Sequence, residues 1–329
     1  MSRNAGPISH ASPGAPESGG AYSVTTTRKW VAGCRWVAGR NWVAGRMWVA
    51  GARPRTLPAA VVPVLVGTAV AVAGGSMIWW RSLDALVVAL AIQIGTNYAN
   101  DYSDGVRGTD AQRVGPRRLV ASGLAAPGAV KAASFCAFGV AGVAGLVLSL
   151  ATSPWLLVVG ALCFAAGWFY SGGSRPYGYA GFGEVFVFAF FGLVAVIGTA
   201  YVNLGHVTAL AVTAAIPVGF LATALLVVNN LRDIESDMVA GKKTLAVRSG
   251  ARATRGLYTA LVVGAFLLVA VIALRRPAAL IALLAVLPAL PPLRRVLGGA
   301  EGHDLVTALA GTGTLQLAFG ALLALGIAL

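Results

Sequence analysis

The sequence contains 329 residues, of which 57% are hydrophobic and only 11% are charged, with a mean hydropathy of +0.78. Soluble domains carry about 25% charged residues, so this composition excludes a soluble enzyme and indicates a polytopic membrane protein. The net charge of +14 does not indicate nucleic-acid binding, because the basic residues follow the membrane topology described below. Cys34, Cys136 and Cys163 are too widely spaced for a disulfide framework or a metal knuckle, so we expect them to pack in the core.

The N-terminal region, residues 1–47, predicts no membrane-spanning structure. Residues 1–28 are rich in Ser, Gly, Pro and Thr, which is typical of a disordered tail, and they contain no apolar stretch of the kind found in signal peptides. A six-residue repeat follows, whose Trp-Val-Ala-Gly copies start at Trp30, Trp36, Trp42 and Trp48. Two interpretations stay open: a sequence expansion whose last copy alone is structural, or a Trp and Arg anchor on an anionic membrane.

The remainder, residues 48–329, predicts an all-α transmembrane domain. Nine apolar segments are long enough to cross about 30 Å of hydrocarbon. They are residues 57–73, 83–100, 130–150, 154–171, 184–202, 208–229, 257–274, 278–297 and 305–329. Pro63, Pro217 and Pro288 interrupt three of them, which membrane helices tolerate because neighbouring helices satisfy the freed backbone groups.

The topology follows from the Lys and Arg residues. If the N-terminus is cytoplasmic, all but three of the 25 basic residues fall on the cytoplasmic side, and the exceptions are Arg81, Arg275 and Arg276. Such a bias is typical of cytoplasmic loops. We therefore expect a multi-pass protein of the plasma membrane with its N-terminus and its acidic motifs in the cytoplasm.

The segment NYANDYSDGVRGTD closes the second apolar run. On a helix Asn97, Asp101 and Asp104 lie at i, i+4 and i+7, so their side chains share one face. An ionised Asp at the centre of a membrane helix costs about 2.5 to 3.5 kcal/mol on the insertion scale, so a pair at a membrane boundary requires compensation. A divalent cation is the compensation that we expect.

A second segment, NNLRDIESDMVAGKK, closes the sixth apolar run with the same chemistry. Asn230, Asp233 and Asp237 lie there at i, i+3 and i+7. Mg²⁺ fits such a pair of motifs, because it binds one or two carboxylates together with substrate phosphate oxygens. The alternative is that these helix-end acids are simply solvated in the cytoplasm.

Basic residues next to both motifs are candidate phosphate ligands. They are Arg107, Arg113, Arg117 and Arg118 after the first motif and Lys242 and Lys243 after the second. Charge-assisted hydrogen bonds suit these donors to phosphate, although any one of them also fits the positive-inside pattern. Carboxylates and bases together predict a metal ion and a polyanionic substrate.

The Gly-rich loop from Tyr170 to Glu184 is predicted to cap this polar site. Its glycines permit close backbone approach, and Arg175 and Glu184 are its only fully charged side chains. Tyr98, Tyr102 and Tyr170 can face an allylic cation, or they can form an interfacial tyrosine belt. His206 and His303 are isolated, and we expect no catalytic role for them.

These residues resemble a known family. The two acidic motifs, the segment ARPRTLP at residues 52–58, and the loop YSGGSRPYGYAGFGE are similar to the intramembrane aromatic prenyltransferases of the UbiA type, and within them to the members that prenylate 1,4-dihydroxy-2-naphthoate in menaquinone biosynthesis. The resemblance runs from about Trp48 to the C-terminus. Many relatives place a third acid where this chain has Gly108, so Asp110 is expected to substitute for it.

The resemblance implies a nine-helix bundle around a central polar cavity with a cytoplasmic cap. It also implies an Mg²⁺-dependent transfer from a polyprenyl diphosphate to the naphthoate, with loss of carbon dioxide, a proton and diphosphate. The catalytic residues implied are Asp101, Asp104, Asp233 and Asp237, with Asp110, Asn97 and Asn230 completing the metal site. The diphosphate would bind Arg107, Arg113, Arg117, Lys242 and Lys243, and the acceptor would bind Arg53, Arg55, Tyr170 and Arg175.

Other functions stay open. A different aromatic acceptor, such as 4-hydroxybenzoate or homogentisate, would keep the chemistry and change the pocket. A cation-coupled transporter would place its acids near the bilayer midplane at broken helices, whereas here they lie at helix ends beside bases. The tighter acidic signature of CDP-alcohol phosphotransferases is absent. Neither the prenyl chain length nor the oligomeric state follows from the sequence.

Overall fold

The computed structural model describes residues 45–109 and 118–329, and Met47–Leu329 form one compact unit. This unit is helical wherever its residues are assigned regular structure. In chain order the elements are η1 (Pro54–Thr56), α2 (Pro58–Ala73), α3 (Trp79–Arg107), α4 (Pro127–Ala151), α5 (Trp155–Phe169), α6 (Gly183–Val187), η2 (Phe188–Val194), α7 (Ala195–Leu204), α8 (Ala209–Arg232), α9 (Ile234–Val239), α10 (Leu245–Ala273), η3 (Pro277–Ala285), α11 (Val286–Leu297) and α12 (Gly302–Ala328).

The helices coincide with the nine predicted apolar segments. Seven helical stretches of the described chain are long and apolar enough to cross a membrane, and the pair Gly45–Thr56 and Pro58–Ala73, bent by 55°, adds an eighth if it is counted as one span. The remaining segment is α5, which is apolar but has only 15 residues. The all-α membrane fold is therefore confirmed, whereas nine crossings and a cytoplasmic cap stay predictions.

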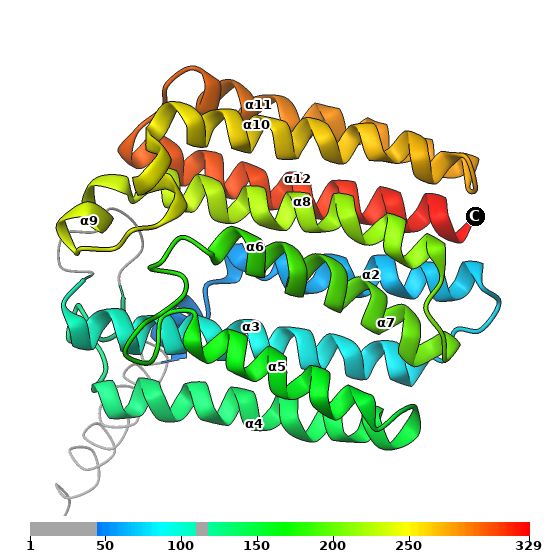
Figure 1. The fold of residues 1–329 in the computed structure, drawn as a ribbon, viewed down its shortest axis with the longest axis horizontal. Coiled ribbons are helices and arrows are strands. Elements are labelled where there is room, and N and C mark those ends of the chain that lie inside the picture. The colour runs from blue at the N-terminus through cyan, green and yellow to red at the C-terminus, as the bar shows by residue number, and fades with distance from the viewer. Residues whose placement is uncertain (1–44, 110–117) are drawn as a thin grey trace, which may run out of the picture. The chain divides into compact units, whose positions relative to one another are not determined.

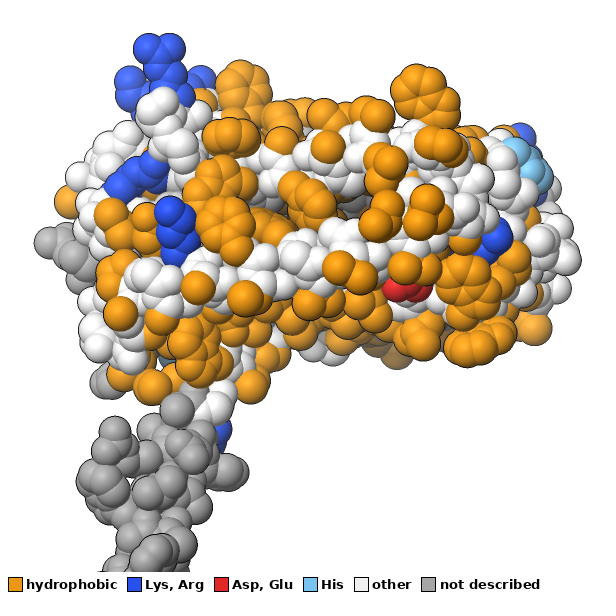
Figure 2. Space-filling model, turned by 90° about the horizontal axis from the view of Figure 1, so that it is seen from below, with side chains coloured by type: hydrophobic (Ala, Val, Ile, Leu, Met, Phe, Trp, Pro, Cys, Tyr) orange, Lys and Arg blue, Asp and Glu red, His pale blue; other side chains and the backbone are white. Residues whose placement is uncertain are grey.

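The helices lie side by side along one direction. In Figure 1, α4 and α5 flank α3 on one side, α10 and α11 lie on the other, and α8 and α12 run between. The end of α3, the loop between α5 and α6, and α9 all gather at the same end of this unit (Figure 1). The face drawn in Figure 2 is hydrophobic through its middle and hollowed there, with Lys and Arg near the two ends. This distribution is the one expected for a protein that sits in lipid.

The core joins α2, α7, α8, α10, η3, α11 and α12. Small residues bring these helices close: at Gly320 of α12 a Cβ atom would lie 2.3 Å from a methyl carbon of Val62 in α2. Tyr258 of α10 and Thr312 of α12 share a buried hydrogen bond of 2.8 Å between their hydroxyls. This half of the unit is tightly packed, and α3, α4 and α5 lie on its other side (Figure 1).

The fifth apolar segment changes helix type in its middle. The π-helix η2 separates α6 from α7, and π segments inside helices occur frequently at functional sites. A Cβ atom at Gly192 would lie 2.6 Å from Cα of Gly219 in α8, so η2 and α8 touch backbone to backbone. Phe190 and Phe191 of this segment both line the cavity described below.

The last copy of the Trp repeat packs against α3. The Trp48 ring meets that of Tyr98 edge-on at 5.7 Å, and the Tyr98 hydroxyl donates a 2.7 Å hydrogen bond to the Trp48 carbonyl. A Cβ atom at Gly51 would lie 2.6 Å from the Leu119 side chain, so this glycine permits the close approach. The first two copies and all but the last residue of the third lie outside the described residues, and their role stays a prediction.

Candidate active site

A cavity of about 340 Å³ opens between α2, α3, α5, the α6–α7 segment and α8. Its polar lining comes from both acidic segments, from the α5–α6 loop, from η1 with its N-cap residue, and from α3. The polar and charged lining residues include Arg53, Thr56, Gln93, Thr96, Asn97, Asn100, Asp104, Arg118, Tyr170, Ser171, Tyr177, Tyr179, Thr199, Asn229, Asn230, Asp233, Asp237, Lys242 and Thr244. The rest of the lining is apolar, so the cavity joins a charged end to a hydrocarbon-like interior.

The last two turns of α3 present Asn100 and Asp104 to the cavity. One helical turn separates the two residues, so they share a face. Asn100 Oδ1 accepts a 2.5 Å hydrogen bond from the Ser171 hydroxyl, which holds the amide in place. Asp104 is buried, and its Oδ2 lies 3.7 Å from an Arg118 Nη atom.

Asp101 does not reach the cavity, contrary to the expectation that it shares a face with Asp104. Its two carboxylate oxygens accept hydrogen bonds from the backbone N–H groups of Leu119 and Val120, at 2.9 and 3.0 Å. Helix geometry alone does not turn Asp101 away, because it lies only about 60° around the helix from Asp104. The physical reason is the tertiary contact, in which the backbone N–H groups of Leu119 and Val120 draw the carboxylate toward the chain that leads into α4. Asp101 therefore anchors that segment to the end of α3.

The second acidic segment changes direction between its two acids. Helix α8 ends at Arg232, Asp233 caps it, and the short helix α9 carries Asp237. Both acids line the cavity, although they lie on successive helices rather than on one. The Arg232 guanidinium donates to both oxygens of Asp233 at 2.7 Å, and also to Asn229 Oδ1 at 2.9 Å. This bidentate contact fixes the carboxylate at the cavity edge.

Lys242 joins the two acidic motifs. Its ammonium nitrogen lies 3.3 Å from Asp104 Oδ1 and 3.7 Å from Asp237 Oδ1, with its side chain only 10% exposed. It also lies 4.7 Å from the ring centroid of Tyr179, at a distance suited to a cation–π contact. A buried ammonium shared by two carboxylates from distant segments shows that both motifs face a single site.

The Gly-rich loop contributes a phenol to this junction. The Tyr179 hydroxyl donates a hydrogen bond to Asp104 Oδ1, and burial together with the negative charge of Asp104 raises the pKa of this phenol above its ordinary value. The phenol therefore stays protonated and remains a donor. Arg107 holds the loop from outside by donating to the carbonyls of Ser171 and Gly173.

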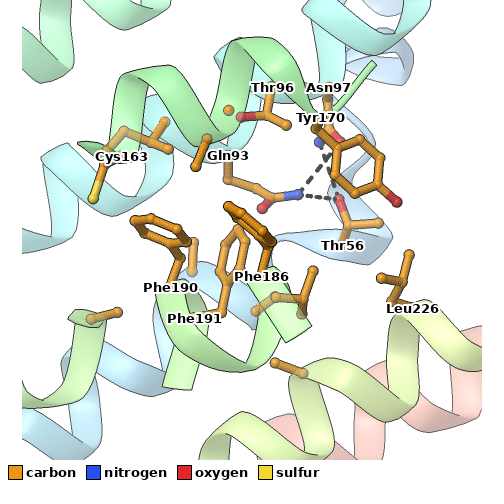
Figure 3. A pocket seen from close by; sticks show the side chains of 18 of the residues that line it. Thr56, Gln93, Thr96, Asn97, Cys163, Tyr170, Phe186, Phe190, Phe191 and Leu226 are labelled. Atoms are coloured by element: carbon orange, nitrogen blue, oxygen red, sulfur yellow. Dashed lines mark hydrogen bonds between the residues drawn. The ribbon is translucent and has the colours of Figure 1, made fainter. Parts of the chain in front are cut away.

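Aromatic side chains line the other part of the cavity. Figure 3 shows Phe186, Phe190 and Phe191 facing Gln93 and Cys163 across the open space. The ring centroids of Tyr177 and Phe186 lie 4.0 Å apart in a stacked arrangement. These rings give the cavity a wall suited to flat or unsaturated hydrocarbon groups.

Eight of the predicted site residues line the cavity and five do not. Those in the cavity are Arg53, Asn97, Asp104, Tyr170, Asn230, Asp233, Asp237 and Lys242. Those placed elsewhere are Arg55, Asp101, Arg107, Arg175 and Lys243. Asp110, Arg113 and Arg117 lie outside the described residues, so their predicted roles stay predictions.

Several lining residues were missed by the sequence analysis. They include Thr56, Gln93, Asn100, Asn229 and Tyr179. Asn100 had a usable signal, because it lies one turn before Asp104 on the same face. Gln93 could also have been recognised from the sequence, because an amide inside an apolar run requires hydrogen-bond partners. No sequence pattern marks Tyr179 among the other tyrosines of its loop.

The donor set fits a hard divalent cation. Asp104, Asp233 and Asp237 offer carboxylate oxygens to one cavity, and Asn100 and Asn229 add amide oxygens, which are the ligand types that Mg²⁺ binds. Within the described residues, however, no three His, Cys, Asp or Glu side chains already cluster closely enough to hold a metal alone. Such a site matches Mg²⁺ bound through few carboxylates together with substrate oxygens.

The comparisons with known proteins agree with this chemistry. The sequence profile of the UbiA prenyltransferase family matches residues 60–300. The chain belongs to the UbiA prenyltransferase family. Several proteins that are similar to this chain in sequence are named 1,4-dihydroxy-2-naphthoate octaprenyltransferase. The one from Mycobacterium tuberculosis is 49% identical over 81% of this chain and 91% of its own, and that from Mycobacterium leprae is 51% identical over 80% and 89%. The Escherichia coli protein of that name is 38% identical over 66% and 73%.

Solved structures confirm the UbiA fold. The apo structure of a UbiA homolog from Aeropyrum pernix K1 aligns with a TM-score of 0.64 at 14% identity, over 80% of this chain and 96% of that one. A UbiA homolog from Archaeoglobus fulgidus, bound to GPP and Mg²⁺, aligns with a TM-score of 0.54 at 17% identity, over 84% and 99%. At these identities the likeness shows the shared helical architecture.

Proposed function

We propose that this protein transfers a polyprenyl group from a polyprenyl diphosphate to 1,4-dihydroxy-2-naphthoate, with loss of carbon dioxide and diphosphate, giving demethylmenaquinol that oxidises to demethylmenaquinone. The observation that carries the proposal is the junction at Lys242, where both acidic motifs meet at the charged end of an otherwise apolar cavity. The names of the mycobacterial relatives, at 49 and 51% identity, support this acceptor over 4-hydroxybenzoate or homogentisate.

The charged end would receive the diphosphate. Asp104, Asp233 and Asp237 would hold Mg²⁺, which when bound neutralises charge on a leaving diphosphate, and the Archaeoglobus fulgidus homolog with GPP and Mg²⁺ supports this cofactor. Lys242 and Arg118 add donors for phosphate oxygens from the protein itself. Asp101 serves this site indirectly, by anchoring the segment that begins at Leu119.

The transfer itself forms one carbon–carbon bond. The allylic C–O bond of the donor breaks, and its electron pair leaves with the diphosphate. The ring carbon that bears the carboxylate then attacks the allylic cation, and the carboxylate departs as carbon dioxide, leaving its bonding pair to restore the aromatic ring. Arg53 and Tyr170, which line the cavity, would position the acceptor, and the apolar walls exclude water that would otherwise quench the cation.

The orientation in the membrane is part of the proposal. Arg107, Lys131, Arg175, Lys242 and Lys243 all belong to the end of the unit that holds the acidic motifs. The opposite end holds Arg81, Arg275 and Arg276. By the positive-inside rule, the active site would open to the cytoplasm from the plasma membrane.

An acceptor panel on membranes containing this protein tests the function. Products are identified by mass spectrometry after incubation with a polyprenyl diphosphate and each aromatic acid, with Mg²⁺ or with EDTA. We expect demethylmenaquinone from dihydroxynaphthoate only, with turnover abolished by EDTA and restored by added Mg²⁺. Prenylation of another acid would overturn the acceptor assignment, and the absence of diphosphate release with every acceptor would indicate a transporter.

Replacing Tyr179 by Phe tests the contribution of the loop phenol. The change keeps the ring beneath Lys242 and removes the hydroxyl that donates to Asp104. A hydrogen bond to a charged group contributes about 1.5 to 3 kcal/mol, so we expect kcat to fall about 10- to 100-fold. Tyr201→Phe, at a tyrosine outside the cavity lining, is the control, and equal activities of the two variants would contradict the assigned role.

A further inference from the structure

A hydrogen-bonded cluster lies in the cavity wall on the membrane side of the acidic motifs. It consists of Arg53, Thr56, Gln93 and Asn97, which we name the amide cluster. Gln93 Nε2 donates to Thr56 Oγ1 at 3.1 Å and to Asn97 Oδ1 at 3.4 Å. Figure 3 shows the Gln93 side chain reaching toward Thr56, with the rings of Phe186 and Phe191 beside it.

The hydroxyl of Thr56 fixes the direction of these bonds. Thr56 Oγ1 donates its single proton to the Arg53 carbonyl at 2.9 Å. It can therefore only accept from its other two neighbours, Gln93 Nε2 and Asn97 Nδ2, each at 3.1 Å. Asn97 is fixed in the same way, because its Nδ2 also donates to the Ala52 carbonyl at 2.8 Å.

This pattern orients the Gln93 amide. Rotating the amide by 180° would bring its oxygen to Thr56 Oγ1, whose proton is already used, so two acceptors would face each other. With Nε2 committed to Thr56 and Asn97, Oε1 is the acceptor that Gln93 presents to the cavity, where the residue is 7% exposed. A carbonyl oxygen in an apolar enclosure favours a ligand that brings a hydrogen-bond donor.

Arg53 adds a cation to the same cluster. Its φ of 54° makes it the single non-glycine residue with positive φ in the described parts of the chain, a conformation that costs about 1 to 3 kcal/mol and clusters at ligand sites. Two hydrogen bonds hold this conformation. The Thr56 hydroxyl donates to the Arg53 carbonyl, and Arg53 Nη2 donates to the Asn97 carbonyl at 3.4 Å. Arg53 lines the cavity.

We propose that the amide cluster is the recognition site for a hydroxylated aromatic carboxylate, in which Gln93 Oε1 accepts a hydrogen bond from a ring hydroxyl remote from the carboxylate while Arg53 pairs with the carboxylate. This inference rests on the proposed function and adds to it the residue that binds the ring hydroxyl remote from the carboxylate. Phe186 and Phe191 supply aromatic surface beside the same position (Figure 3). The acceptor is then distinguished from an aromatic acid that lacks the remote hydroxyl.

Two ligands and two variants test this assignment. The ligands are 1,4-dihydroxy-2-naphthoate, measured as a substrate by its KM, and 1-hydroxy-2-naphthoate, measured by its Ki against that substrate. We expect Gln93→Met to raise the KM of the dihydroxy acid about 10-fold, the loss of one hydrogen bond, and to leave the Ki of the monohydroxy acid within about twofold. Arg53→Gln should raise both constants by the same factor, because both ligands carry the carboxylate.

The control is Gln316→Met, the same change at a buried glutamine of α12 that does not line the cavity. Gln316→Met should leave the KM and the Ki unchanged. If size-exclusion chromatography shows that Gln93→Met is unfolded, Gln93→Leu provides a second variant. The assignment would be overturned if the Gln93 variants shifted the KM of the dihydroxy acid and the Ki of the monohydroxy acid equally, or shifted neither. Turnover by the wild-type protein would still uphold the proposed function in that case. Absence of wild-type turnover would instead reject the proposed function.

Discussion

Replacing Asp104 by Asn should lower kcat by about 10²- to 10³-fold, which corresponds to about 2.7 to 4 kcal/mol of barrier. Asp104 is the acid that most contacts converge on: Lys242 and the Tyr179 hydroxyl meet its Oδ1, and Arg118 lies 3.7 Å from its Oδ2. The neutral amide keeps the size of the side chain but loses the negative charge that would bind Mg²⁺ and balance Lys242. The measurement is single-turnover transfer at saturating Mg²⁺ with both substrates.

Asp101→Asn is the informative comparison, because both acids belong to the same motif. Its carboxylate accepts two backbone hydrogen bonds instead of facing the cavity, so the amide should lower the melting temperature while kcat falls far less than in Asp104→Asn. Asp304→Asn, at an exposed acid in the first turn of α12, controls for the charge change itself. If Asp101→Asn and Asp104→Asn lost kcat equally at equal folded fraction, the separation of their roles would be wrong.

The fold could be predicted from the sequence because the hydrophobicity that marks each helix is summed over many residues. Each apolar segment carries many residues of one kind, so the nine predicted segments and the observed helices agree even where an end differs by several residues. Helix α3, for example, continues to Arg107, past the predicted end at residue 100. The break between α6 and α7 could not be predicted, because η2 depends on the Gly192 and Gly219 contact between two distant segments.

The site could be predicted only to the level of the motif. Asn100 and Asp101 are neighbours of similar polarity, and only the contact with Leu119 decides which of them turns away from the cavity. The same holds for Lys242 and Lys243. The first is buried between two carboxylates, while the second is exposed and is held through its backbone, by the Tyr179 carbonyl and by the Arg248 side chain. Spacing rules place such residues on a segment, whereas tertiary contacts choose between them.

If the prenyl tail occupies the apolar part of the cavity, the length of that part limits the donor that can bind. The cavity lining on α3 runs from Asp104 to Ala85, which at 1.5 Å per residue is about 28 Å. Ala85 belongs to a buried cluster with Val64, Leu148 and Val202, and this cluster marks the apolar end. Gly145 of α4 lies one turn before Leu148 and lines the cavity, and a Cβ atom there would meet nothing within 4 Å. A larger side chain at this position would therefore occupy space otherwise open to the prenyl tail.

Replacing Gly145 by Leu should change the preferred donor. Each buried CH₂ contributes about 0.8 kcal/mol, so excluding one five-carbon unit costs about 4 kcal/mol of binding. We expect the ratio of kcat/KM for octaprenyl diphosphate to that for geranyl diphosphate to fall by at least about 100-fold, while geranyl transfer stays near the wild-type rate. In the proposed mechanism the reacting end of either donor would lie at Asp104 and Lys242, far from the substitution, so we expect the chemical step to be unaffected.

Gly139→Leu in the same helix is the matched control. Gly139 also has nothing within 4 Å of an added Cβ atom, yet it is exposed and lies outside the cavity lining. The same residue change therefore adds the same apolar side chain to α4 without entering the cavity, and the donor ratio should keep its wild-type value. A fall of equal size in both variants would mean that Gly145→Leu acts by disturbing α4. An unchanged ratio in Gly145→Leu would mean that the prenyl tail leaves the cavity before it reaches this turn, through the hydrophobic face that contacts lipid.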